Sequence, residues 1–241
     1  MGGADVGLLS LRLVGVCGQN KIGIVGVGQT ACDVLDLCDL NEALKTGDIL
    51  DHLSDADLII LVGGTEEKMF PVVLDAAKNS GALVISTRDV SSPSMNECLP
   101  GIIKALVSIA GSDDPNCIDM ADLQTFLEDY GLTAFGTGQG FGVDKMTDAA
   151  KQALDYPMMA GKVGAKKILL EITAGKNASM KELHNVYSLV RTVMDEDVMT
   201  ICGCRCDPKM GSLNSACVII MAGGGVVDGQ EQSLEPLCRI V

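Results

Sequence analysis

Two aspartates, Asp119 and Asp122, stand three residues apart in the stretch "CIDMADLQTFL", at the start of an apolar pattern with helical spacing. Side chains at i and i+3 lie on one face of a helical turn. Two carboxylates on one face can orient a water molecule or hold a cation. The same residues can instead cap the helix, because acidic side chains accept hydrogen bonds from the first backbone N–H groups. The pair alone leaves both interpretations open.

Glycine-bearing turns follow two apolar segments, "KIGIVGV" and "DLIILVG", in a pattern that suits anion binding. A strand that turns through glycine into a helix directs backbone N–H groups at phosphate oxygens. The first turn lacks the third glycine of the dinucleotide fingerprint, and no P-loop lysine follows it. A tight turn for helix–sheet packing explains it equally well. The candidate nucleotide-binding residues in these two turns are Gly26, Gly28, Gln29, Thr30, Gly63, Gly64 and Thr65.

Two glutamates, Glu66 and Glu67, follow directly after the second turn. Their carboxylates would repel the negative charge of a triphosphate. The sequence therefore predicts that the scaffold of a nucleotide site is kept while nucleotide binding is lost or weakened.

Three of the ten cysteines lie at alternate positions, Cys202, Cys204 and Cys206. A strand would place their sulfurs on one face, because side chains alternate along a strand. Thiolate zinc sites usually use C-x2-C spacing and a fourth ligand, for which Cys217 is the candidate. Structural or incidental thiols are the favoured interpretation, and no metal is expected.

Composition limits the class of protein. The chain has 241 residues with a net charge of −14, and 47% of them are apolar. A core is expected, and nucleic acid is an unfavourable direct partner because it requires a basic face. No apolar run is long enough to span a membrane, and the first residues do not read as a secretion leader. The expected location is cytoplasmic.

The order of elements predicts an α/β front half. Two buried strands at residues 57–64 and 82–88 flank a helix, which is a βαβ unit with a parallel sheet. Residues 89–100 are expected to form a loop, and a helix is expected from Gly101. The back half alternates helices and strands and is expected to end in a β-hairpin across residues 207–214.

Several motifs together resemble the FtsZ branch of the tubulin superfamily. "IDMADLQTFL" is similar to the family's catalytic loop and the following helix, and "AFGTGQGFGVDKMTDAAKQAL" is similar to its glycine- and alanine-rich strand–helix unit. The segment from "KKILLEITAG" through "CDPKMGSLNSACVIIMAG" resembles the family's last strands. The best match covers residues 101–223. In the front half, the two glycine turns resemble the family's first glycine loop and its phosphate loop.

The resemblance implies a Rossmann-like nucleotide-type domain, here shortened, joined by a helix to an α+β FtsZ-type C-terminal domain. The corresponding boundaries are residues 1–100, 101–118 for the connecting helix and loop, 119–225, and a short tail at 226–241. By the same resemblance, Asp119 and Asp122 are the catalytic residues that act on a neighbouring subunit's GTP, with Mg²⁺. The phosphate loop is about four residues short, and no match exists between Arg88 and Gly101 for the family's sugar- and base-binding segments.

Three functions stay open at this point. The first is an FtsZ-like cytoskeletal, cell-division-type protein that assembles head to tail into filaments, with lost or weakened GTP binding. Its partners would be other copies of itself and a true FtsZ-family protein. The second is a divergent polymer that binds GTP and hydrolyses it, and if the chain is an enzyme it is a GTPase. The third is a metal- or redox-linked module centred on the cysteine row.

Overall fold

A computed structural model describes residues 9–15, 20–38, 43–44, 53–64, 67–87, 93–112, 116–162, 164–194, 197–224, 226–227, 230–233 and 237–241. Contacts divide the chain into two compact units. Unit 1 comprises Met1–Asp113 and Cys238–Val241, and unit 2 comprises Asp114–Leu237. The boundaries expected at residues 100, 118 and 225 stay predictions.

Unit 1 is built on a six-stranded sheet with the order β12-β5-β4-β2-β1-β3. Strands β2, β4 and β5 run parallel, as the βαβ pattern predicts, whereas β1, β3 and β12 pair antiparallel to their neighbours. The expected α/β fold class is confirmed, although the sheet is mixed rather than wholly parallel. The strands are β1 (Leu9–Gly15), β2 (Lys21–Val27), β3 (Ala43–Leu44), β4 (Leu58–Gly63), β5 (Leu83–Thr87) and β12 (Cys238–Ile240).

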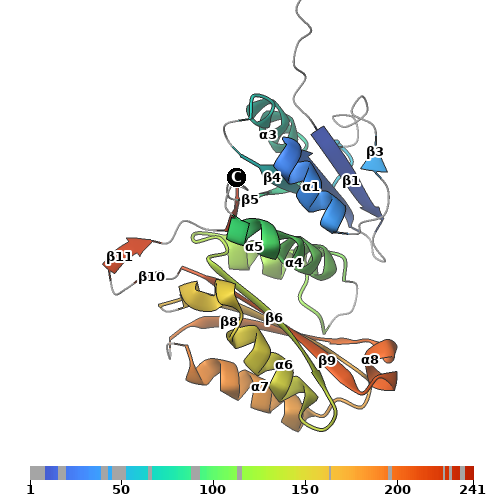
Figure 1. The fold of residues 1–241 in the computed structure, drawn as a ribbon, viewed down its shortest axis with the longest axis vertical. Coiled ribbons are helices and arrows are strands. Elements are labelled where there is room, and N and C mark those ends of the chain that lie inside the picture. Colours follow the sequence, from blue (N-terminus) through green and yellow to red (C-terminus); the bar gives the residue numbers. More distant parts are fainter. Residues whose placement is uncertain are drawn as a thin grey trace, which may run out of the picture. The chain divides into compact units, whose positions relative to one another are not determined.

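Three helices of unit 1 are described: α1 (Gln29–Leu37), α3 (Phe70–Asn79) and α4 (Pro93–Ala110). Strand β4 is buried along its whole length, which explains its continuous apolar sequence. Helix α3 buries Phe70, Val73 and Ala77 in a core with β2 and β4. The blue helix α1 lies beside β1 in Figure 1 and also contacts α4.

Helix α4 corrects one prediction. It begins at Pro93 rather than at Gly101, so most of the expected loop is helical. Proline is well tolerated in the first turn of a helix, because its missing N–H would have no intrahelical partner there. The misleading residue was Pro100, which lies inside the helix although proline usually disfavours that place.

Unit 2 contains a four-stranded sheet with the order β6-β9-β7-β8. Strand β8 runs parallel to β7, and β9 runs antiparallel to both β6 and β7. The expected hairpin between the last two strands is therefore wrong, since β7 lies between them. The strands are β6 (Ala134–Phe141), β7 (Lys167–Ala174), β8 (Met199–Cys206) and β9 (Ser215–Gly223), and a separate pair is formed by β10 (Val226–Val227) and β11 (Gln230–Ser233).

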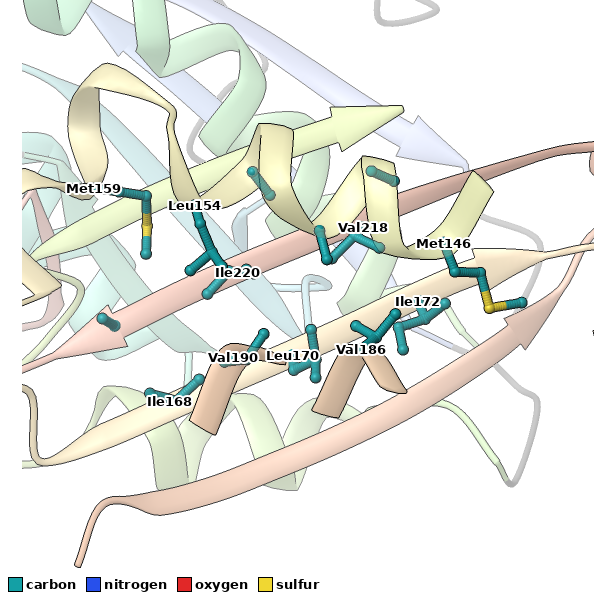
Figure 2. Packing of buried hydrophobic residues seen from close by; sticks show 14 of the residues in the cluster. Met146, Leu154, Met159, Ile168, Leu170, Ile172, Val186, Val190, Val218 and Ile220 are labelled. Carbon is teal, nitrogen blue, oxygen red and sulfur yellow. The ribbon is translucent and has the colours of Figure 1, made fainter. Parts of the chain in front are cut away.

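The helices of unit 2 pack on both faces of this sheet. Helices α6 (Lys145–Leu154) and α7 (Met180–Thr192) cover one face, where their apolar side chains meet β7 and β9 (Figure 2). Figure 2 shows Met146 and Leu154 of α6 above Val218 and Ile220 of β9. Helix α5 (Met120–Leu127) lies against the other face, near the start of β7. The short helices are η2 (Pro157–Lys162) and α8 (Pro208–Ser212).

Three glycines at alternate positions of β6 let α6 approach the sheet closely. A Cβ added to Gly136, Gly138 or Gly140 would collide with a backbone carbonyl oxygen of α6. Backbone atoms cannot move aside as a flexible side chain can, so only glycine fits at these places. The repeat "GTGQG" and the alanine-rich helix that follows it are thus two halves of one packing arrangement.

Replacing Gly138 with alanine should therefore destabilise unit 2 by about 2 kcal/mol or more, because the helix must shift away from the strand. The three tyrosines of the chain, all in unit 2, report its urea unfolding by fluorescence. The control is Thr137→Ala, which faces the other side of β6 and should cost less than about 1 kcal/mol. Equal unfolding midpoints for the two variants would contradict this explanation of the glycine repeat.

Candidate functional site

The two aspartates form a reciprocal cap at the start of α5. The Asp122 N–H donates to Asp119 Oδ1 (2.9 Å), and the Asp119 N–H donates to Asp122 Oδ2 (3.2 Å). Capping is thus present, and each carboxylate uses one oxygen for it. The pair lies at the protein surface, so the remaining oxygens can reach water or a cation. Their catalytic role stays a prediction, and capping does not conflict with it.

The loop in front of the aspartates is held on the edge of β8. The Cys204 N–H donates to the Asn116 carbonyl oxygen (3.0 Å), and the Cys117 thiol donates to the Cys204 carbonyl oxygen (3.8 Å). A Cβ at Gly203 would come within 2.7 Å of both the backbone nitrogen and a side-chain carbon of Ile118. Gly203 therefore gives the loop room to lie against the strand, which sets the position of Asp119.

A buried charge pair lies on the same face of the sheet as this contact. Glu171 of β7 is the register partner of Gly203 and is fully buried. Arg205 Nη2 is 3.0 Å from Glu171 Oε1, but neither carboxylate oxygen has a hydrogen-bond partner among the described residues. Burial raises the pKa of Glu171, and the charge of Arg205 opposes that rise. The only sign of this charge pair in the sequence was a single acid inside the apolar strand "KILLEITA", and the sequence interpretation missed it.

The two glycine turns meet at one edge of the sheet in unit 1. Their strands are parallel neighbours, with Val27 and Gly63 in register at the ends. Gly28 has a φ of 91° and forms the start of α1, where no side chain caps the helix. Gly26 lies close to Leu35 and the backbone of Ala31, so the expected role in helix–sheet packing is present too. Whether these residues bind a nucleotide stays a prediction.

The remaining candidates of the two turns are placed as follows. Gln29 and Thr30 are exposed in the first turn of α1, and the Gln29 amide donates to Asp33 Oδ1 (2.6 Å). Gly64 accepts a hydrogen bond from the Glu67 N–H (3.2 Å), which closes the second turn. Thr65 and Glu66 lie outside the described residues.

Glu67 occupies the space in front of the first glycine turn. A Cβ at Gly28 would fall on the carboxylate of Glu67, so this side chain lies directly against the glycine. Gly28 is buried although the next two residues are exposed. The Phe70 N–H donates to the Glu67 carbonyl oxygen (2.9 Å), which fixes the backbone of Glu67 at the start of α3. The helix end that would face an anion is thus covered by a negative side chain of the chain itself.

The cysteine row does not acquire the fourth ligand proposed for it. Cys202, Cys204 and Cys206 share a face, because they are in register with alternate residues of β7. Cys217 is in register with Thr173, which points to the opposite face, so its assignment as fourth ligand is wrong. Cys202 is exposed, but partial desolvation still raises the pKa of its thiol, which disfavours the thiolate that binds metal. Among the described residues, no group of three or more His, Cys, Asp or Glu side chains is placed to hold a metal ion.

A second ion pair that the sequence interpretation missed ties α6 to α7. Lys145, nearly buried, places its Nζ 3.4 Å from Glu182 Oε1. Glu182 also accepts hydrogen bonds from Ser179, which caps α7. The Ser179 hydroxyl and then its backbone N–H lower the pKa of Glu182 most, burial opposes them, and Lys145 adds a smaller lowering. The sequence "SMKE" has the pattern of a capping box. The ion pair could not be seen in it, because Lys145 comes from a distant segment.

Part of the chain is similar in sequence to FtsZ proteins. Residues 131–224 match the model of the FtsZ family, C-terminal domain. Cell division protein FtsZ 1 of Archaeoglobus fulgidus is 26% identical over 126 residues, which are 52% of this chain and 34% of that protein. Cell division protein FtsZ of Coxiella burnetii is 27% identical over 137 residues, 54% of this chain and 36% of that protein. The chain thus spans about a third of the length of these relatives.

Two solved structures share the fold. An empty FtsZ dimer from M. jannaschii superposes with a TM-score of 0.57 at 17% identity, covering 79% of this chain and 69% of that one. A mutant FtsZ of the same organism gives a TM-score of 0.59 at 18% identity, covering 78% and 72%. At this identity the likeness concerns the fold.

An α/β unit with a parallel central sheet, combined with a second sheet unit of this topology, is the fold that the chain shares with these FtsZ structures. The expected resemblance is confirmed: the chain is similar to FtsZ proteins, and its residues 131–224 match the FtsZ C-terminal domain family. None of the helices in the described part of the chain is both long and apolar enough to cross a bilayer.

Replacing Arg205 with methionine should destabilise unit 2 by about 3–5 kcal/mol at pH 7, because it leaves the buried Glu171 carboxylate without its cation. The raised pKa of Glu171 sets the sign of the pH effect. The folded state holds the proton more tightly than the unfolded state, so the variant should regain stability as the pH falls from neutral toward 4.5.

The double variant Glu171→Gln, Arg205→Met is the control, because it carries no buried charge at this place. Its stability should not show the recovery between neutral pH and 4.5. Tyrosine fluorescence in urea at several pH values measures both proteins. If the Arg205→Met variant lost stability as steeply as the control when the pH is lowered, the buried-charge explanation would be contradicted.

Proposed function

We propose that this chain is an FtsZ-like assembly protein that self-associates head to tail and has lost or weakened GTP binding. The observation that carries the proposal is the contact between the Glu67 carboxylate and Gly28. A phosphate at the start of α1 would have to displace this side chain. A negative carboxylate at this place also repels a phosphate through its charge.

Self-association is supported by the way the acidic loop is held. The Asp119 and Asp122 cap is anchored to β8, and both side chains lie at the surface. In a head-to-tail assembly this loop would face the glycine turns of the next copy. Lys68, exposed beside Glu67, or a divalent cation would bridge the acids of the two copies. The relatives are named cell division proteins, so we extend the proposal to a cytoskeletal role in cell division. A true FtsZ-family protein is the second partner that we propose.

A divergent GTPase is the second candidate function. The observation in its favour is that both glycine turns lie at one sheet edge, next to the uncapped start of α1. Unpaired N–H groups at a helix start attract phosphate. In that case Glu67 would swing away when GTP and Mg²⁺ bind, and Asp119 and Asp122 would act on the neighbour's nucleotide.

We expect the purified protein to carry no guanine nucleotide and to hydrolyse GTP no faster than background. Chromatography of the denatured protein and a phosphate-release assay measure this. The variant Glu67→Ala should bind a fluorescent GTP analogue roughly threefold to tenfold more tightly, because one nearby like charge is removed. Asp75→Ala, an exposed acid on α3, changes the net charge equally and should leave the affinity unchanged. Bound GTP or GDP in the wild type would favour the second candidate.

Assembly should depend on the charge of Asp122. Asp122→Ala and Asp122→Asn both remove the charge, but asparagine keeps an oxygen for the cap. We expect both variants to assemble less than the wild type, with only the alanine variant about 1 kcal/mol less stable. Light scattering and electron microscopy with and without Mg²⁺ measure assembly, which should weaken as salt is added. A wild type that stays monomeric under all these conditions would refute head-to-tail assembly through this loop.

A further inference from the structure

The outer edge of β5 is covered by the short strand β12. The two strands pair antiparallel, with Cys238, Arg239 and Ile240 opposite Thr87, Ser86 and Ile85. The Val241 N–H adds a hydrogen bond to the Val84 carbonyl oxygen (3.1 Å). The first residue of β5 is half-buried and the rest are buried. Strand β5 therefore behaves as an inner strand of the sheet that needs a neighbour on this side.

Strand β12, the neighbour of β5 on this side, is held by few contacts. Strand β12 has three residues, whereas strands in globular proteins average about five or six. Cys238 is fully buried, and burial raises the pKa of its thiol to about 12. Arg239 is exposed and Ile240 is only half-buried, so most of the anchoring apolar contact comes from one small residue and Val241.

The pairing also leaves one polar group unsatisfied. Thr87 is 5% exposed, and its hydroxyl has no hydrogen-bond partner among the described residues. Cys238 stands directly opposite on the same face and does not supply one. A buried unpaired hydroxyl is unfavourable, and water would satisfy it once β12 leaves. The free-energy cost of detaching β12 is thus partly offset by hydration of the Thr87 hydroxyl.

We propose that the edge of β5 is a strand-binding site, filled within one copy by β12 and exchangeable for the β12 of a second copy. The same four residues make the same contacts in either arrangement, so concentration decides between them. Strand β12 is also where the chain passes from unit 2 back to unit 1, between Leu237 and Cys238. Exchange would therefore join unit 2 of one copy to unit 1 of the next.

This association differs from the one proposed for the acidic loop. It uses backbone hydrogen bonds and buried apolar side chains, which salt screens little. It needs no nucleotide, no divalent cation and neither aspartate. If the wild type stayed monomeric in the magnesium experiment at low concentration, assembly through the acidic loop would be refuted. Strand exchange would still be decided by the separate experiment below.

The test uses a disulfide between register partners. In Thr87→Cys, the new thiol lies opposite Cys238 at a separation that suits a disulfide. Isotopically heavy and light copies of this variant are mixed, incubated at several concentrations and oxidised with diamide, which accepts the two electrons and two protons. Non-reducing gels and peptide mass spectrometry then show whether the 87–238 disulfide lies within one copy or between two. The control is Thr87→Cys with Cys238→Ser, which should give no such link.

Strand exchange predicts linked peptides with one heavy and one light partner, and an increase of several-fold in covalent dimer when the concentration rises about tenfold. Links confined to single copies at every concentration would overturn the proposal.

A second measurement uses the unmodified protein, in case the Thr87→Cys variant does not fold. A peptide with the sequence of residues 237–241, carrying serine in place of cysteine, competes for the edge of β5. It should speed the alkylation of Cys238 by iodoacetamide several-fold, while Cys38, equally buried in unit 1, keeps its rate. Equal rates with and without the peptide would show that β12 does not exchange.

Discussion

Helix α6 lies so close to β6 that its carbonyl oxygens fill the space above the three glycines of the strand. Because backbone atoms meet there, the separation of helix and sheet is fixed by the chain geometry rather than by adaptable side chains. The core shared by α6, α7, β7 and β9 then follows from this separation. The same device recurs at Gly203, where the loop before Asp119 rests on β8. The placement of the acidic loop in unit 2 therefore depends on a missing Cβ, as the packing of α6 does.

Electrostatics add a second layer to this arrangement. Glu171 and Arg205 lie beside the glycine on which the loop rests, and the carboxylate is fully buried. Such a pair contributes little net stability compared with apolar residues, but it strongly disfavours any arrangement that separates its members. It therefore selects one position of β8 against β7, and with it one position of the loop that β8 carries. In unit 1, Glu67 acts differently, because it covers a helix start that would otherwise face an anion.

Much of the fold was predictable from local patterns. The apolar runs and glycine turns around Gly28 and Gly63 indicated strand–turn–helix units, and motif similarity indicated the FtsZ type. Local patterns failed where pairing between distant segments decides. The sequence "DPKMGSLN" has the composition of a hairpin turn, but β7 pairs with β8 along one edge and with β9 along the other, so this turn does not join neighbouring strands.

The candidate site divides in the same way. The capping alternative for Asp119 and Asp122 could be stated from their spacing, and it is present. The contact between Glu67 and Gly28 could not be predicted, because it joins two turns through the register of β2 and β4. The role of Cys217 as a fourth metal ligand is likewise excluded by strand order, because β7 lies between β8 and β9. A single buried acid such as Glu171 is visible in a sequence, but its partner is not.

The discontinuous make-up of unit 1 has a consequence for how the protein is made. Its last strand is synthesised only after the whole of unit 2, because β12 follows Leu237 in the chain. Domains fold largely as units while the ribosome is still adding residues. The edge of β5 therefore stays bare on the nascent chain while unit 2 is being synthesised. During that interval the exposed edge is a place where a molecular chaperone, or a neighbouring nascent chain on the same messenger RNA, can bind.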